Sequence, residues 1–306
     1  MKLLYTALVA VVFIGSFVIG FSYRSKQLGI PFNLKTFNIG SSSLPKLANN
    51  SPFPVVSGQG VIAIDGLSNV TLYEKDADKQ LYPASTTKIV TALVALDYYK
   101  PDQIITVLNP TVEGQKMGLI PGEQITFDSL LNGLLIYSAN DAAITLSDSY
   151  PGGRDSFVNA MNNKARELHL DNSHFANPVG LDDITQVTTA RDMVRLGEVA
   201  MENPAFSKIV GTKSKSVTSI DGKYIHYLAN VNQLLGKVDG VAGIKTGWTE
   251  AARENLITYV ERNNHKVYIA VLGSQDRFGE TTELIDWIYG NYSWQASTSF
   301  TLSSMR

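Results

Sequence analysis

The 306-residue sequence contains no cysteine and only four histidines, and its charges nearly cancel. Without cysteine the chain can form neither disulfides nor thiolate metal sites, and it has no cysteine nucleophile. The histidines are scattered without a paired spacing, which argues against a histidine-ligated zinc site. Lys and Arg total 26 against 28 Asp and Glu, a formal net charge of −2. This balance argues against general binding to the phosphate backbone of nucleic acids, which requires a basic face.

The first residues are far more apolar than the rest of the chain. The segment from Leu3 to Tyr23 carries no charge, and about 20 apolar residues suffice to span a bilayer as a helix. A cleaved secretory signal usually has a shorter apolar region, followed by small residues at the cleavage site. Because Ser22-Tyr23-Arg24 is a poor cleavage site, we interpret residues 1–23 as a retained N-terminal membrane anchor, with a cleaved signal as the alternative.

Two segments outside the main body have little pattern of their own. Residues 24–57 contain four prolines and runs of Ser and Asn, with no sustained helical or alternating pattern, so they are predicted to form a tether. Residues 291–306, rich in Ser and Thr from Ser297 onwards, are predicted to form a tail. One folded domain, residues 58–290, lies between them.

This domain is predicted to have strands at both ends and helices between them. One β-hairpin comprises residues 60–65 and 70–74, and a second comprises residues 255–261 and 266–272 around Asn263-Asn264. Helices, several of them opening on Ser, Thr or Asp, are predicted at residues 85–99, 128–136, 141–149, 156–169, 189–201 and 281–289. The order indicates an α+β fold, an antiparallel sheet with a helical insertion.

A serine and a lysine stand three residues apart at the start of one predicted helix, in the motif Ser85-Thr-Thr-Lys88. The apolar run that follows predicts a buried helix, on which Ser85 and Lys88 share one face. Burial disfavours an ammonium group and pushes Lys88 towards a neutral amine, which can act as the base for a serine nucleophile. A capped helix with a lysine that reaches solvent explains the motif equally well.

Two further short motifs follow in the chain. Ser138-Ala-Asn140 lies between two predicted helices, where a polar turn can present both side chains to a cleft or simply cap the second helix. Lys245-Thr-Gly247 is predicted to lie on an edge strand whose small residues let a substrate backbone approach closely, although an ordinary strand with a solvated lysine is the alternative. The conjunction of the three motifs, rather than any one of them, carries the functional signal.

The order S-x-x-K, S-x-N, K-T-G resembles that of penicillin-binding proteins and serine β-lactamases. The surrounding sequence is similar to the low-molecular-weight, serine-type D-alanyl-D-alanine carboxypeptidases over residues 58–290. The segments that carry this resemblance are Pro83–Lys88, Pro121–Glu123, Ser138–Ala143, Asn177–Asp182, Thr189–Asp192, Asn230–Leu235 and Gly243–Gly247. The resemblance implies a DD-peptidase/β-lactamase-like fold, in which helices flank an antiparallel sheet, an all-helical lobe is inserted, and a cleft lies between the two.

The resemblance also implies roles for individual residues. Ser85 would attack the carbonyl of a terminal D-Ala-D-Ala bond with Lys88 as base, and Ser138 would relay the proton to the departing amine. Asn140 would hold the substrate amide and Lys88. The backbone N–H groups of Ser85 and Trp248 would form the oxyanion hole. The segment Lys245, Thr246 and Gly247 would meet the substrate near its carboxylate.

Two arginines complete the family comparison. Similar enzymes bind the terminal carboxylate with an Arg ten residues before a Trp in the closing helix, and Arg277 and Trp287 keep that spacing. The sequence departs from the family at Ala252-Arg253, where Ala-Gly is usual. We expect Arg253 either to crowd the cleft or to add a second cation that binds an anion.

Three alternative functions share some of these features. A D,D-endopeptidase uses the same acyl chemistry on cross-linked peptides. A class A β-lactamase needs a glutamate for deacylation, and Glu167-Leu-His-Leu-Asp171 is a near match to the loop that carries it. A catalytically silent wall-binding protein would be expected to have lost Ser85 or Lys88.

The implied partners are peptidoglycan stem peptides and β-lactams, together with the cytoplasmic membrane through the N-terminal segment. Base, relay and oxyanion donors are all protein groups, so no metal and no organic cofactor is expected. Chemistry directed at the cell wall places the catalytic domain on the extracytoplasmic face of the membrane, or in a secreted form if the leader is cleaved.

Overall fold

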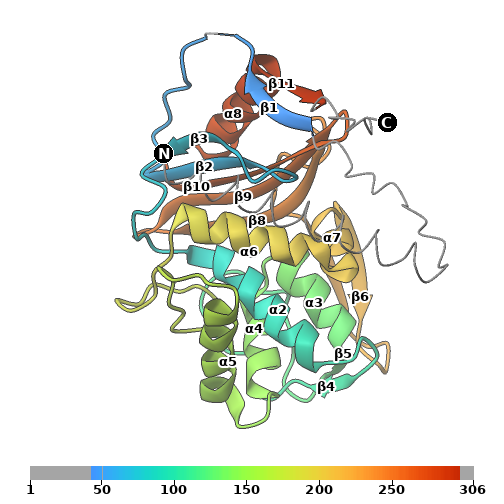
Figure 1. Cartoon of the computed structure of the whole chain (residues 1–306). Coiled ribbons are helices and arrows are strands. Elements are labelled where there is room, and N and C mark those ends of the chain that lie inside the picture. Colours follow the sequence, from blue (N-terminus) through green and yellow to red (C-terminus); the bar gives the residue numbers. More distant parts are fainter. Residues whose placement is uncertain (1–42, 50, 297–306) are drawn as a thin grey trace, which may run out of the picture. The chain divides into compact units, whose positions relative to one another are not determined.

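The computed structural model describes residues 43–49 and 51–296 (Figure 1). The predicted anchor, residues 24–42 of the predicted tether and residues 297–306 lie outside the described residues. Among the helices that are described, none combines the length and the apolar character needed to cross a membrane.

A five-stranded antiparallel sheet forms one half of the described domain, in the order β3-β2-β10-β9-β8. Both predicted hairpins are confirmed, and the turn residues Asn263 and Asn264 both have positive φ (52° and 62°), as two-residue hairpin turns require. The strands are β2 (Gly60–Asp65), β3 (Thr71–Lys75), β8 (Val241–Thr249), β9 (Arg253–Arg262) and β10 (His265–Ser274).

Each face of the sheet is covered by helices (Figure 1). Alternate residues of β10 point to opposite faces: Ala270 joins the core beneath α6, whereas Ile269 joins the core beneath α8. The helices are the 3-10 turn η1 (Ala84–Thr87), α2 (Lys88–Tyr98), α3 (Phe127–Ile136), α4 (Asn140–Asp148), α5 (Gly153–Glu167), α6 (Ala190–Glu202), α7 (Pro204–Val210) and α8 (Arg277–Asn291).

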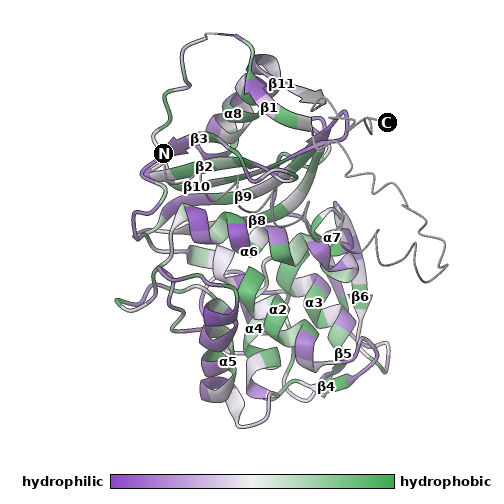
Figure 2. Cartoon of the chain, viewed as in Figure 1, coloured by the Kyte–Doolittle hydropathy of each residue, from purple (hydrophilic) through white to green (hydrophobic). Residues whose placement is uncertain are grey.

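Helix α2 runs through the helical lobe with every residue from Lys88 to Ala95 buried, as its continuous apolar sequence predicts. Figure 2 shows this contrast, since α2 is largely green and α5 largely purple. Helix α8 begins four residues before the predicted start because Asp276 caps it by accepting a hydrogen bond from Gly279 N at 2.9 Å.

The lobe contains elements that the sequence patterns did not predict. Helix α7 begins at Pro204 after Asn203, whose side chain accepts hydrogen bonds from Ala205 N and Phe206 N; this is a recognisable start signal for a helix that is otherwise short. Two small hairpins, β4–β5 (Ile104–Thr106 and Gln124–Thr126) and β6–β7 (Ser214–Thr218 and Ile225–Ala229), also lie in the lobe. It is therefore helical apart from these two hairpins.

Part of the predicted tether and part of the predicted tail pair with each other. Strand β1 (Ser43–Leu47) is antiparallel to β11 (Tyr292–Ala296). This ribbon is fixed to the sheet by Trp294, whose indole N–H donates to Asp65 Oδ2 at 2.7 Å and whose ring stacks on His265 with 4.4 Å between centroids. The pairing partner lies about 250 positions away, which is why no local pattern indicated it.

Candidate active site

Ser85 lies in the 3-10 turn η1, and Lys88 begins α2 on the same face. Lys88 Nζ is hydrogen-bonded to Ser85 Oγ at 2.8 Å, as the three-residue spacing predicts. The turn before Ser85 is held by Asn255 of β9, whose Nδ2 donates to Tyr82 O at 2.9 Å and to Pro83 O at 3.0 Å. The serine is thus fixed against the sheet from outside its own helix.

Lys88 is fully buried, and its second hydrogen bond goes to Val179 O at 2.7 Å. Burial, and next the charge of Lys245, hold the pKa of Lys88 well below its usual value, although Asp141 acts in the opposite direction. The lysine therefore favours the neutral amine. A neutral amine in contact with a hydroxyl can accept its proton.

The loop that supplies the Val179 carbonyl passes very close to the serine turn. Asn177 Oδ1 accepts hydrogen bonds from the backbone N–H groups of residues 179, 180 and 181, which folds the loop tightly. Gly180 has φ of +89°, and a side chain there would overlap the Ala84 carbonyl. Glycine is therefore required by both conformation and space.

Ser138 lies in the turn between α3 and α4, as predicted, whereas Asn140 is the first residue of α4; both are buried. Asn140 Nδ2 donates to Glu113 O at 2.6 Å, whereas its Oδ1 has no hydrogen-bond partner within the described chain. The contact with Lys88 that the family resemblance implied for Asn140 is not formed in this structure. A buried amide oxygen without a partner is costly, so it is available for a donor from a bound molecule.

The Lys245-Thr-Gly247 motif lies on β8, which is an edge strand of the sheet as predicted. Lys245 Nζ donates to Ser138 Oγ at 2.8 Å, which links this strand to the helical lobe. Burial, with the charge of Arg277 second, lowers the pKa of Lys245 to about 7. A side chain at Gly247 would press against Pro83 O and Ser85 N at 3.1 Å, so the strand backbone lies directly beside the serine.

Arg277 begins helix α8 and points to the same strand. Its Nη1 donates to Gly247 O at 2.7 Å, and its backbone N–H donates to Glu254 Oε2 at 2.9 Å. Burial lowers the pKa of the guanidinium from its usual value, with Glu254 opposing, but an arginine keeps its charge. The nearby Trp248 side chain is 62 % exposed.

These residues surround one cavity of about 760 Å³ between the sheet and the helical lobe. Its volume is that of a site for a small molecule or a peptide end. Lys88 and Lys245 lie just behind its wall. Of the predicted site residues, the lining includes Ser85, Ser138, Asn140, Thr246, Gly247, Trp248 and Arg277.

Arg253 neither lines the cavity nor crowds it. It is exposed at the start of β9 with φ of +59°, in the left-handed region that favours glycine. The usual glycine at this position is therefore explained by the backbone. The expectation that Arg253 crowds the cleft is wrong, and the alternative, a second cation that binds an anion in the cleft, finds no support because Arg253 is not among the cavity residues.

Other residues of the site carried no motif of their own. Val179 contributes only a backbone carbonyl, which any residue type provides. Asn255 acts through contacts with residues about 170 positions earlier in the chain. Only the family segment Asn177–Asp182 pointed to the loop that closes over Lys88.

Comparison with known proteins agrees with this geometry. The family model described as D-alanyl-D-alanine carboxypeptidase, Peptidase S11, matches residues 47–276. D-alanyl-D-alanine carboxypeptidase DacF of Bacillus subtilis (strain 168) is 31% identical over 245 residues, 76% of this chain. The alignment spans 62% of DacF, less than two thirds of its length. A D-alanyl-D-alanine endopeptidase of Pseudomonas aeruginosa is 31% identical over 258 residues, covering 82% of this chain and 83% of the relative.

Solved structures give the same result for the fold. The Streptomyces K15 DD-transpeptidase superposes with a TM-score of 0.73 at 29% identity, covering 78% of this chain and 100% of that chain. The D-alanyl-D-alanine carboxypeptidase of Mycobacterium tuberculosis H37Rv superposes with a TM-score of 0.75 at 32% identity, covering 82% and 99%. The predicted α+β DD-peptidase fold is confirmed, and the chain belongs to the Peptidase S11 family of serine-type D-alanyl-D-alanine carboxypeptidases.

Proposed function

We propose that this chain removes the terminal D-Ala from peptidoglycan stem pentapeptides through an acyl-enzyme on Ser85, and that β-lactams acylate the same serine. The observation that carries the proposal is the Ser85–Lys88 pair, with 2.8 Å between Oγ and Nζ and the amine fully buried. Relatives that carry the name D-alanyl-D-alanine carboxypeptidase support the choice of substrate.

In the first step, Ser85 Oγ attacks the carbonyl carbon of the D-Ala-D-Ala bond while its proton passes to Lys88. The neutral form of Lys88 that burial favours is the form that can accept this proton. The negative charge that develops on the carbonyl oxygen is stabilised by the backbone N–H groups of Ser85 and Trp248. The close approach of Gly247 to Ser85 N supports this arrangement.

In the second step, the bond to the departing D-Ala breaks and its nitrogen takes up a proton. This is the proton that Lys88 received from Ser85, and the Ser138 hydroxyl, held by its hydrogen bond from Lys245 at 2.8 Å, relays it to the nitrogen. Water then attacks the acyl carbon while Lys88 takes up one of its protons, and this proton passes to Ser85 Oγ as the acyl bond breaks. Both amines end the cycle in their starting states.

The remaining cavity residues hold the peptide. Asn140 Oδ1 accepts from a substrate amide, because it is buried without a partner in the described chain. Arg277 binds the terminal carboxylate, with Lys245 and Thr246 lining the adjacent strand. Charge-assisted hydrogen bonds to a carboxylate are stronger than neutral ones, which favours a substrate with a free C-terminus.

The test is incubation of the protein with a stem pentapeptide and, separately, with a cross-linked peptide dimer. Release of free D-Ala from the pentapeptide and no cleavage of the dimer is the expected result. Cleavage of the dimer identifies the D,D-endopeptidase, a name that one relative carries. Peptide binding without turnover of either substrate identifies the silent wall-binding protein and refutes the proposal.

A β-lactamase activity is disfavoured by the position of Glu167. Its carboxylate accepts from Lys164 at 2.7 Å on the outside of α5, with 65% of the side chain exposed, and it does not line the cavity. It is therefore not placed to activate water for deacylation. We expect a penicilloyl-enzyme that persists for minutes, and hydrolysis within seconds contradicts this assignment.

We also propose that residues 1–23 anchor the protein in the cytoplasmic membrane with the catalytic domain on the extracytoplasmic side. The support is the uncharged segment from Leu3 to Tyr23 and the location of peptidoglycan. Fractionation of cells that express the full chain tests this, with mass spectrometry of the purified protein to detect cleavage. Recovery of an uncleaved chain in the soluble fraction refutes it.

A further inference from the structure

One wall of the cavity is formed by the segment between β4 and β5, residues 107–123, which we call the wall loop. Glu113, Gly114 and Gln115 of this loop line the cavity. The loop also receives two hydrogen bonds from Asn140, from Nδ2 to Glu113 O at 2.6 Å and from the backbone N–H to Gln115 O at 2.7 Å. The orientation of the Asn140 amide therefore depends on where the wall loop lies.

The part of the wall loop behind the cavity is attached to α4 by one buried carboxylate. Asp141 accepts hydrogen bonds from the backbone N–H groups of Met117, Gly118 and Leu119 at 2.9 to 3.0 Å. These contacts occupy the backbone N–H groups of residues 117–119. The carbonyl of Met117 is not bound by Asp141 and needs a different partner.

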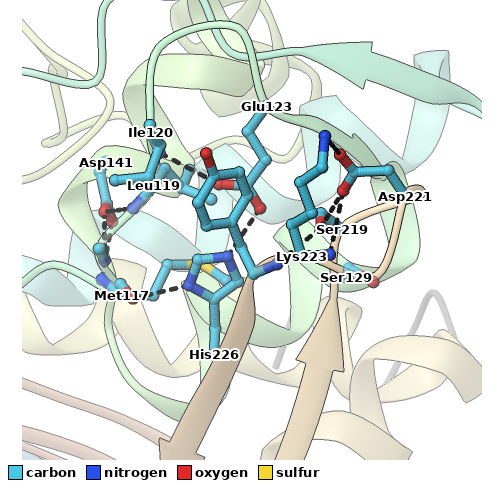
Figure 3. Close-up of polar contacts among 12 residues, drawn as sticks. Met117, Leu119, Ile120, Glu123, Ser129, Asp141, Ser219, Asp221, Lys223 and His226 are labelled. Atoms are coloured by element: carbon cyan, nitrogen blue, oxygen red, sulfur yellow. Dashed lines mark hydrogen bonds and ion pairs between the residues drawn. The ribbon is translucent and has the colours of Figure 1, made fainter.

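That carbonyl is bound by a buried histidine on the neighbouring hairpin. His226 of β7 lies with Nδ1 3.0 Å from Met117 O and Nε2 2.7 Å from Glu123 Oε1. The other carboxylate oxygen of Glu123 accepts from Ile120 N at 3.1 Å. Figure 3 shows the His226 ring between Met117 and Glu123, with Asp141 beyond Met117.

Each of these buried polar groups depends on the others for its hydrogen bonds. The two ring nitrogens of His226 face two different oxygen atoms, Met117 O and Glu123 Oε1, so the ring links the loop backbone to the carboxylate. The His226 side chain is 5% exposed and the Glu123 side chain is fully buried, so water cannot replace a lost partner. Loss of the His226 or the Glu123 contact therefore leaves a buried polar group without a hydrogen-bond partner, which is costly.

We infer that His226 and Glu123 are positioning residues for the reaction. They hold the wall loop where Glu113 O and Gln115 O orient Asn140 towards the substrate. Neither side chain lines the cavity, and the Ser85–Lys88 pair is held by other elements, η1, α2 and the loop at Val179. Loss of the histidine should thus weaken substrate binding more than it weakens the reactivity of the serine.

The inference rests on the proposed acylation of Ser85, and its test uses the rate at which a fluorescent penicillin acylates the full chain. Saturation kinetics give a maximal rate and a half-saturation concentration, each normalised to active protein by titration. We expect His226→Phe to raise the half-saturation concentration about tenfold while the maximal rate changes by less, because displacement of a positioning group mainly affects binding and orientation.

Two variants separate hydrogen bonding from folding. In Glu123→Gln the amide N–H can donate to His226 Nε2 and the amide oxygen can accept from Ile120 N, so every contact is kept and wild-type half-saturation is expected. In Glu123→Met both contacts are lost, and an increase like that of His226→Phe is expected. The methionine variant carries the test if the phenylalanine variant does not fold.

The matched control is His265→Phe, on β10 of the sheet. His265 stacks on Trp294 at 4.4 Å, a contact that a phenyl ring retains, and it is not a cavity residue. An unchanged half-saturation concentration in both His226→Phe and Glu123→Met overturns the inference, even if active protein or thermal stability falls. Failure of penicillin to acylate the wild type refutes the proposed function instead.

Discussion

The buried amine of Lys245 should make the stability of this protein depend on pH above neutrality. Its pKa is about 7 in the folded protein, against an ordinary value of 10.5. Between those two values the unfolded chain binds a proton that the folded chain does not. The free energy of unfolding therefore rises with pH in this window, by up to about 1.4 kcal/mol per pH unit.

The magnitude follows from the two pKa values. Integration between about pH 6.5 and about pH 9.5 gives a gain of about 3 kcal/mol from this single group. Lys245→Met has no such titration and should show a flatter dependence.

The assay is urea unfolding of wild type and Lys245→Met at both pH values, with the free energy extrapolated to water. The difference between the two proteins cancels contributions from groups that the substitution does not affect. We expect the wild type to gain more stability with rising pH than the variant does. Parallel pH dependence in the two proteins would show that the amine is charged when folded and would refute the reasoning.

Three other predictions follow from the backbone and the cavity. Arg253→Gly should increase the free energy of unfolding by about 1 kcal/mol in urea with no change in penicillin acylation, because it relieves a positive φ; a loss of acylation would contradict this. Arg277→Gln should lower kcat/KM for pentapeptide about 10- to 100-fold, and an equal loss on a substrate with an amidated C-terminus would exclude carboxylate binding. Gly180→Ala should destabilise the protein by at least about 2 kcal/mol and reduce acylation, because the methyl group overlaps the Ala84 carbonyl; a normal melting temperature would contradict it.

The sequence was most informative where structure and chemistry are local. The three-residue spacing of Ser85 and Lys88 predicted a contact that one helical turn creates, and the turn at Asn263-Asn264 predicted a hairpin from two neighbouring residues. The start of a helix that a single side chain caps can also be predicted from the sequence. Asp276 belongs to this class, because its side chain alone caps the start of α8.

The remaining features depend on contacts between distant positions. Asn255 holds the serine turn, and His226 binds a loop that lies more than 100 positions earlier in the chain. Neither residue has a distinctive neighbourhood in the sequence. The expectation for Arg253 is wrong for a different reason. A preference for glycine at this position reflects its positive φ, which a single sequence does not distinguish from the geometry of a cleft.

The ribbon of β1 and β11 has a consequence for the order of folding. It joins Leu47 to Tyr292, so its closure spans about 245 residues and costs about 5 kcal/mol of chain entropy if nothing else is folded. The sheet and α8 must therefore form first and bring the two strands together. During synthesis β1 emerges about 245 residues before its partner β11, so within the described domain the ribbon closes only after the sheet and α8 are in place.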